Sequence, residues 1–403
     1  MADAVIGLSA AADNTRGMRS MVWVTSQIGY LIGIFVGIDL QYYKTTDGGK
    51  TWGAAVTLFT GTVDSYDVWY DQWTPGDSGR IIHIAFTEAG TDDVSYLALN
   101  TANDVVTSIV DVFAGASTVE GRGTFTSITK ARGGNLFVLF NIDAFAETGL
   151  YRSTDNGVTW GSRTNPLEAN LDQAMLFPAN AADPQDIWMI YDDDSTTELT
   201  IKTHDDSANT NSESAALTFD NEGTDFTGQY GFSGAIRHSD GHLIFAFFNA
   251  FDAAGTDFLV YEWDGTTATA LTAITTNIDD MYYPSVYLNQ NEPDDIYIGY
   301  TGLSDGSQTL RTTASVYYAK SSNRGLTWTK DIAYSSASTD YAQTWCALNG
   351  ERFSLVFWDI SAFDAFGNYD ASIDFGFTSL NNYQSPKGTG QNNTGKISIG
   401  GIG

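Results

Sequence analysis

A pair of strand-like segments recurs seven times along the chain, and this recurrence restricts the fold more than any other feature. The second segment of each pair is a continuous apolar run; the runs begin at Tyr30, Arg80, Asn135, Asp186, His242, Asp295 and Arg352, about 50 to 57 residues apart. A run that is apolar at every position fits a strand covered on both faces. Turns rich in Gly, Asp, Asn and Pro separate the two segments of a pair. Repeats of this length predict an all-β protein, a β-propeller.

The count of repeats predicts seven blades of four strands each. The expected blades begin near residues 18, 66, 122, 172, 229, 281 and 341. Six blades is the alternative if the first or last unit is mispaired. The last unit has no obvious fourth strand, and either residues 4–10 or residues 396–399 could complete it. We expect one propeller domain over residues 1–380 and a flexible arm rich in Gly and Asn over residues 381–403.

A second, shorter pattern occurs three times at the ends of strands, at Thr45–Trp52, Ser153–Trp160 and Ser321–Trp328. It has the form Ser/Thr-x-Asp/Asn-x-Gly-x-Thr-Trp. We expect the acid or amide to accept hydrogen bonds from turn amides, the Gly to take a positive φ, and the Trp to fold back over the turn. The residues concerned are Asp47, Gly49, Trp52, Asp155, Gly157, Trp160, Asn323, Gly325 and Trp328.

This pattern resembles the Asp-box, or BNR repeat, of the sialidase-like β-propeller family. The resemblance is specific only at the three turns, and the third carries Asn323 where the family usually has Asp. It implies that the boxes are structural and lie on the blade rim. It also implies an extracellular setting and the binding or cleavage of carbohydrate.

The charge of the chain restricts its partners. The formal net charge is −30, from 49 acidic and 19 basic side chains. Such a surface repels phosphates and anionic lipids, so we expect neither nucleic acid binding nor membrane insertion. The apolar run over residues 28–38 is too short to span a bilayer. The first residues have no basic segment, so we expect no secretory signal and no transmembrane segment.

The loops between the second and third strands of each unit form the expected binding face. Three of them contain an Ala-Phe core beside an acid: Asp143 with Phe145, Phe251 with Asp252, and Phe363 with Asp364. An aromatic ring can cover the apolar face of a sugar while a carboxylate accepts hydrogen bonds from its hydroxyls. The alternative is that each Phe only packs its own loop against the blade.

Acids recur near the starts of the first strands, at Asp67, Asp172, Asp280, Asp340 and Glu120. We expect them to face water around the axis. Coordination of a hard cation such as calcium is an open alternative, and otherwise we expect no cofactor. His238 and His242 flank a turn without the spacing of metal ligands, and we expect both to be exposed.

The resemblance also raises the question of catalysis. Sialidases hold a carboxylate with three arginines and use a Tyr nucleophile, and the candidates here are Arg16, Arg122 and Arg311 with Tyr282 or Tyr341. The Arg-Ile-Pro element that usually supplies the first arginine is absent. A glycosidase of another kind needs two carboxylates at a suitable separation, and the sequence does not select a pair.

These observations favour a non-enzymatic propeller on the surface of a tailed-virus virion, as a capsid decoration or as part of a tail or fibre. We expect it to bind a host surface glycan, to attach to other virion proteins through its termini, and to be oligomeric in the assembly. The alternatives are a sialidase-like glycoside hydrolase and a purely structural scaffold.

Overall fold

The part of the chain described by the computed structural model consists of β-strands joined by turns. Its only helical segment is the 3₁₀ turn η1 (Asp71–Trp73), and none of its helices has the length and apolar character that crossing a bilayer requires. The described residues are 4–6, 19–34, 39–89, 91, 93–115, 125–142, 147–166, 171–193, 198–218, 231–248, 258–274, 281–303, 314–334, 341–345, 348–350, 353, 355–359 and 364–367.

The strands form seven sheets, and six of these are built from strands that are consecutive in sequence. The first three contain β2 (Met21–Trp23), β3 (Gly29–Ile34), β4 (Leu40–Thr45) and β5 (Val56–Phe59); β6 (Val63–Tyr70), β7 (Ile81–Glu88), β8 (Val94–Asn100), β9 (Val105–Val106) and β10 (Val110–Phe113); and β11 (Phe125–Lys130), β12 (Leu136–Ile142), β13 (Glu147–Ser153) and β14 (Gly161–Arg163). The next three contain β15 (Leu171–Pro178), β16 (Ile187–Asp193), β17 (Glu198–Asp205) and β18 (Thr210–Thr218); β19 (Phe232–Ile236), β20 (Leu243–Phe248), β21 (Phe258–Trp263) and β22 (Ala268–Ala270); and β23 (Met281–Asn289), β24 (Ile296–Leu303), β25 (Ala314–Ser321) and β26 (Thr329–Tyr334), with β28 (Asn349–Gly350) parallel to β23.

The seventh sheet joins the last strands of the propeller to the first strand of the chain. It contains β27 (Tyr341–Trp345), β29 (Val356–Asp359), β30 (Asp364–Gly367) and β1 (Ala4–Ile6). Strand β1 pairs antiparallel with β30, with Ala4 opposite Gly367. The N-terminal alternative for the fourth strand is therefore confirmed, and residues 396–399 lie outside the described part. The six-bladed alternative is the one that matches, and the expected seven blades are not supported, because the remaining sheet is a composite of strands from both ends of the described chain.

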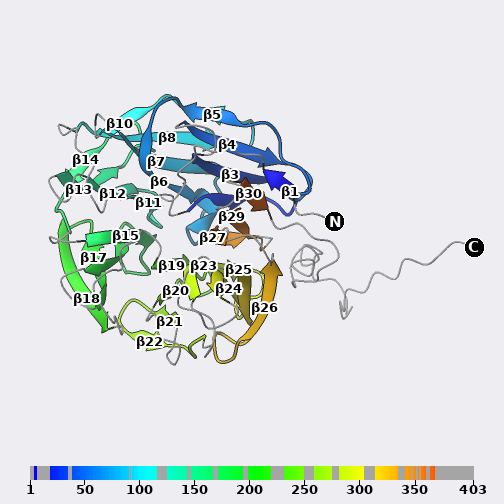
Figure 1. Ribbon diagram of the computed structural model, residues 1–403. Coiled ribbons are helices and arrows are strands. Elements are labelled where there is room, and N and C mark those ends of the chain that lie inside the picture. Colours follow the sequence, from blue (N-terminus) through cyan, green and yellow to red (C-terminus); the bar gives the residue numbers. More distant parts are fainter. Residues whose placement is uncertain are drawn as a thin grey trace, which may run out of the picture.

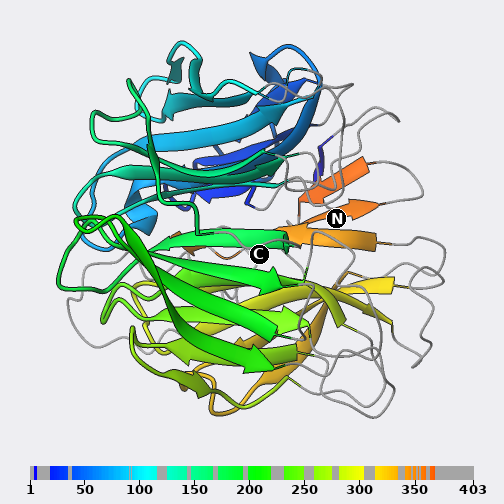
Figure 2. The ribbon, with the colours of Figure 1, turned by 90° about the vertical axis from the view of Figure 1, so that its left-hand side faces the viewer.

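The sheets follow one another around a ring, with the first strand of each sheet toward the centre (Figure 1). Strands β6, β11, β15, β19, β23 and β27 contact one another in this order. Seen from the side, the sheets of the first part of the sequence lie above those of the later part (Figure 2). The predicted all-β propeller is thus confirmed. The inner strands begin at residues 21, 63, 125, 171, 232, 281 and 341.

The second strands supply much of the core, as their composition predicts. Strand β12 is buried at all seven positions, and β7 is buried at every position except its two ends. Neighbouring sheets cover these strands on both faces, which is why polar residues do not alternate along them. Each fully buried Leu, Ile or Phe contributes about 1.5–3 kcal/mol to stability.

An ion pair on the axis corrects one expectation. Asp67 does not face water: it is fully buried, and Arg19 donates to both of its carboxylate oxygens, at 2.9 and 2.5 Å. The arginine also donates to the carbonyl oxygens of Ile128 and Leu176, so the pair joins segments of four sheets. A buried carboxylate must be paired, and the segment before β2 supplies the partner. Of the other acids, Asp172 lies in β15 with its side chain outside the description, and Asp280, Asp340 and Glu120 lie outside it entirely.

The three eight-residue turns share one hydrogen-bonding pattern, as predicted. In the first, Asp47 Oδ1 accepts from the Thr51 amide at 3.0 Å, and Thr45 Oγ1 accepts from the Gly49 amide at 2.9 Å. The same bonds recur in the second and third turns. The central glycines have φ values of +88°, +86° and +80°, which a side chain would strain. Residues Asp155, Gly157, Trp160, Asn323, Gly325 and Trp328 thus have the same structural function as Asp47, Gly49 and Trp52.

Candidate functional site

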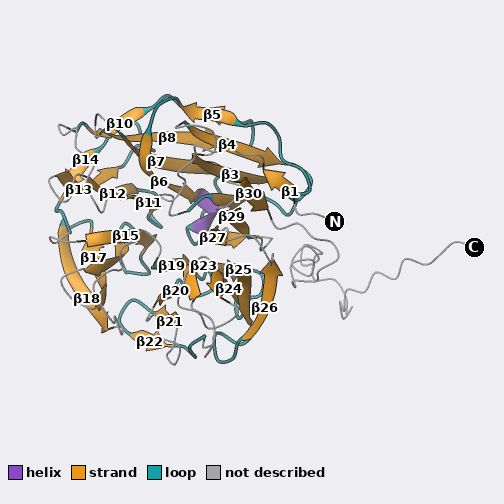
Figure 3. Cartoon of the chain, viewed as in Figure 1, coloured by secondary structure: helices purple, strands orange, loops and turns teal. Residues whose placement is uncertain are grey.

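A cavity of about 230 Å³ lies at the carboxyl ends of the inner strands, and the turn η1 in its wall lies near the centre of the ring (Figure 3). Five chain segments form it: the end of β2, the turn after β6, the ends of β19 and β23, and strand β28. The lining residues are Trp23, Val24, Tyr70, Gln72, Trp73, Asp77, His238, Gln290, Asn291 and Asn349. We call this space the axial cavity.

The turn after β6 places most of the aromatic surface. The Thr74 amide donates to the Asp71 carbonyl oxygen and closes η1, and Trp69 Nε1 donates to Thr74 Oγ1 at 2.9 Å. The Thr74 hydroxyl in turn donates to the Lys130 carbonyl oxygen in the neighbouring sheet. These bonds fix the turn that carries Trp73, a residue of the cavity wall.

Three aromatic rings stand in the wall of the axial cavity. Trp73 packs edge-on against Trp69, with ring centroids 5.7 Å apart, and against Tyr70, at 6.4 Å. Trp23 packs against Trp52 of the first eight-residue turn. All three cavity-lining rings are buried, so the site is formed before any ligand arrives.

Three buried polar atoms of residues in this wall have no partner. Tyr70 and Trp73 are 1% exposed and Asn349 is 2% exposed, yet Tyr70 Oη, Trp73 Nε1 and Asn349 Oδ1 make no hydrogen bond. The other end of the Asn349 amide lies 3.4 Å from His238 Nε2. Leaving a buried donor or acceptor unpaired costs about 1–3 kcal/mol. A ligand that carries hydroxyl groups could supply partners for these atoms.

Neighbouring contacts orient the remaining polar groups. The Gln290 amide accepts from the His238 backbone N–H at 2.9 Å and donates to the Ile236 carbonyl oxygen. His238 Nε2 lies 3.2 Å from the Trp73 carbonyl oxygen. Burial lowers the pKa of His238, so its ring is neutral near pH 7.

Among the described residues of the cavity wall, Asp77 is the only one with a charge, and Lys130 already compensates it. Lys130 Nζ lies 2.7 Å from Asp77 and 2.6 Å from Asp71. Burial raises the pKa of Asp71, but hydrogen bonds from His83 and Lys130 outweigh it and bring this pKa to about 2. Burial lowers the pKa of Lys130, and its bonds to the two acids raise it further than burial lowers it. The lysine is therefore charged and fully engaged.

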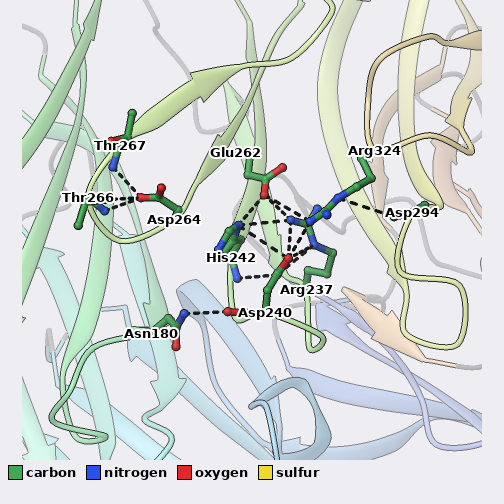
Figure 4. Close-up of polar contacts among 10 residues, drawn as sticks. All are labelled: Asn180, Arg237, Asp240, His242, Glu262, Asp264, Thr266, Thr267, Asp294 and Arg324. Atoms are coloured by element: carbon green, nitrogen blue, oxygen red, sulfur yellow. Dashed lines mark hydrogen bonds and ion pairs between the residues drawn. The ribbon is translucent and has the colours of Figure 1, made fainter.

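A second polar cluster lies beside the axial cavity and corrects the expectation that both histidines are exposed. His238 and His242 are each half-buried. His242, Asp240 and Glu262 offer ligand atoms that lie within 4.8 Å of one another, and they point toward Arg237 (Figure 4). Asp240 accepts from Arg237 Nε at 3.0 Å, and Glu262 pairs with the same guanidinium.

The cluster also joins two sheets. Arg324 reaches from the third eight-residue turn and pairs with Asp240 at 2.7 Å. The guanidinium groups of Arg237 and Arg324 thus pair with the carboxylates that a cation would need as ligands. This favours a structural function of the cluster over metal binding. We name these five residues, Arg237, Asp240, His242, Glu262 and Arg324, the interblade cluster.

Most of the predicted ligand-binding and catalytic residues fall outside the described part: Asp143, Phe145, Phe251, Asp252, Phe363, Arg16, Arg122 and Arg311. Asp364 begins β30, where its backbone pairs with Asp359. Tyr282 lies near the start of β23 and Tyr341 begins β27, at the end of the inner strands opposite to the axial cavity. These assignments stay predictions.

The residues of the axial cavity were not predicted from the sequence, because the loops expected to bind lie at the other end of the inner strands. The sequence does contain an indication of this cavity. Aromatic or amide side chains stand at or just after the ends of several first strands, as in the segments VWYDQW and LNQNE. Sequence alone does not show that Trp73 and Asn349, which are distant in the chain, share one wall.

No protein-family model matches the chain, and no curated protein matches it. Among solved structures, it is similar to an ulvan lyase of polysaccharide lyase family PL25, with a TM-score of 0.55 and 12% identity over 90% of this chain and 95% of the lyase. The same lyase bound to -[GlcA(1-4)Rha3S]- gives a TM-score of 0.54, with the same identity and coverage. A triple mutant of AofleA from Arthrobotrys oligospora gives 0.50 and 10% identity over 81% of this chain and 88% of that one. These likenesses show the fold alone: the chain is a β-propeller.

Proposed function

We propose that this propeller binds carbohydrate in the axial cavity. The observation that carries the proposal is the set of unpartnered buried atoms, Tyr70 Oη, Trp73 Nε1 and Asn349 Oδ1, in a wall that contains three aromatic rings. Sugars present apolar C–H faces and hydroxyls that donate and accept, so rings and amides together match them. A few polar groups within a largely formed pocket are typical of small-ligand sites.

The comparisons are consistent with this proposal. The similar lyase is described as acting on a polysaccharide, and one of its structures holds an oligosaccharide. At 12% identity the ligand does not carry over, so the argument rests on the residues of this chain.

We propose binding without cleavage at this cavity. A glycosidase needs two carboxylates on either side of the scissile bond. Among the described residues that line the cavity, Asp77 is the only acid, and it is paired with Lys130. Tyr70 is also a poor base, because burial raises its pKa to about 12.

The setting we propose is the surface of a virion, on a capsid or tail, with a host surface glycan as ligand. This proposal rests on two expectations from the sequence: the extracellular setting that the Asp-box resemblance implies, and the lack of a secretory signal in the first residues. Mass spectrometry of purified particles would test it: the chain should be recovered with the structural proteins, and its absence from intact particles would contradict this setting.

The test of the function is a glycan array with the purified chain, with reducing-sugar release measured in the same wells. We expect binding without release. Asn291→Ala removes an exposed amide from the cavity and should weaken binding, whereas Gln27→Ala removes an exposed amide elsewhere and should not. Binding that both variants retain unchanged would place the ligand outside the cavity. Sugar release would instead favour the glycoside hydrolase.

A further inference from the structure

We infer that the axial cavity selects a single uncharged sugar at the end of a glycan and rejects sialic and uronic acids. This inference rests on the proposed function and names its ligand class. Three properties of the cavity carry it: its size, its charge and the hydrogen-bonding character of its unpartnered atoms.

The size of the cavity favours one terminal residue. Its volume of about 230 Å³ is below the roughly 300–1,000 Å³ of pockets for drug-sized ligands. The rings of Trp23, Tyr70 and Trp73 are buried in its wall, and the cavity is partly open to solvent. A space of this volume holds one sugar residue and not a stretch of several, so we assign the cavity to the residue at a chain end.

The charge of the cavity disfavours acidic sugars. No described lining residue carries a positive charge at pH 7: Asp77 is an acid, and His238 is neutral because burial lowers its pKa. The nearby Lys130 is held by Asp71 and Asp77. A ligand carboxylate would lose its hydration without gaining a counter-ion, which is costly. The net charge of −30 adds repulsion at long range.

The unpartnered atoms discriminate in the same direction. Asn349 Oδ1 is an acceptor and needs a donor from the ligand, whereas Trp73 Nε1 is a donor and needs an acceptor. A hydroxyl group does both. An ionised carboxylate only accepts, so a carboxylate placed against Asn349 Oδ1 would leave this atom unpaired. Neutral sugars, which are rich in hydroxyls, therefore fit both atoms.

A matched pair of glycans tests this inference. One member ends in a neutral sugar, and the other is the same glycan capped with sialic acid; both are titrated into the wild-type chain. We expect the neutral glycan to bind at least tenfold more tightly. Equal or tighter binding of the capped glycan would overturn the inference while leaving the proposed function in place. If the chain binds no glycan on the array, the proposed function itself fails.

A charge variant adds a second readout. Asp77→Asn keeps the acceptor for the Gly79 amide, which Asp77 Oδ1 holds at 2.7 Å, and releases part of the charge of Lys130 toward the cavity. The preference for the neutral glycan should fall several-fold. Asp111→Asn removes the same charge from an exposed position on the outer strand β10 and should leave the preference unchanged. An unchanged preference in a folded Asp77→Asn chain would contradict the assigned electrostatic origin.

Discussion

Two buried polar regions lie along the inner strands of the propeller, and they differ in how completely their hydrogen bonds are satisfied. At the first, Asp67 accepts from Arg19, from Ser127 Oγ and from the Ile128 amide. At the second, Trp73 Nε1 and Asn349 Oδ1 have no partner. Since an unpaired buried group is costly, the satisfied region is built for stability and the unsatisfied one for a ligand.

The largest effect is expected at the satisfied region. Asp67→Ala leaves the Arg19 guanidinium buried without its counter-ion and should lower the free energy of unfolding by about 3–5 kcal/mol. Chemical denaturation of the variant and the wild type measures this. Asp111→Ala, at an exposed acid, is the control and should change stability by less than about 0.5 kcal/mol. If Asp67→Ala lowers the free energy of unfolding by less than about 1 kcal/mol, the Arg19–Asp67 ion pair does not have the stabilising function proposed for it.

The interblade cluster should give a smaller effect of the same kind. Arg237→Met removes one of the two guanidinium groups that pair with both Asp240 and Glu262. Both acids are partly exposed and Arg324 remains, so we expect a loss of about 2 kcal/mol. The melting temperature should fall. If the variant is as stable as the wild type, Arg237 is not needed to neutralise the two acids. A cation bound by Asp240, His242 and Glu262 would then be the better interpretation.

The network behind the cavity predicts a pH dependence. The pKa of Asp71 is about 2 in the folded chain, below the roughly 3.9 of an unfolded chain. A lowered pKa stabilises the fold at pH values above the unfolded pKa, and this contribution disappears as the pH falls through 2. The stability difference between the wild type and Asp71→Asn should therefore shrink from about 2 kcal/mol at pH 6 toward zero at pH 2. A difference that is constant over this range would show that the carboxylate charge is not involved.

The smallest effect tests one unpaired donor. Trp73→Phe keeps an aromatic ring in the cavity and removes Nε1, so glycan binding should weaken about 3- to 10-fold. Trp263 is the matched control, because its Nε1 is also buried and unpaired but does not line the cavity. Trp263→Phe should not change binding by a folded chain. Equal losses in both variants would remove the distinction between a ligand-directed donor and an unpaired core donor.

Local patterns of the sequence predicted much of the fold. The continuous apolar run of β12 indicated a strand covered on both faces, and the Gly positions of the eight-residue turns indicated positive φ. The pairing of Arg19 with Asp67 was not predictable, because it joins residues from different sheets. The axial cavity was missed for the same reason: Trp73 and Asn349 become neighbours only when the ring closes.

The most direct test of the central claim is a crystal structure of the chain soaked with the neutral terminal sugar that binds best on the array. We predict that the sugar lies in the axial cavity, with hydroxyl groups within hydrogen-bonding distance of Trp73 Nε1 and Asn349 Oδ1. A sugar bound at the opposite end of the inner strands, near Tyr282 or Tyr341, with the axial cavity empty, would contradict it.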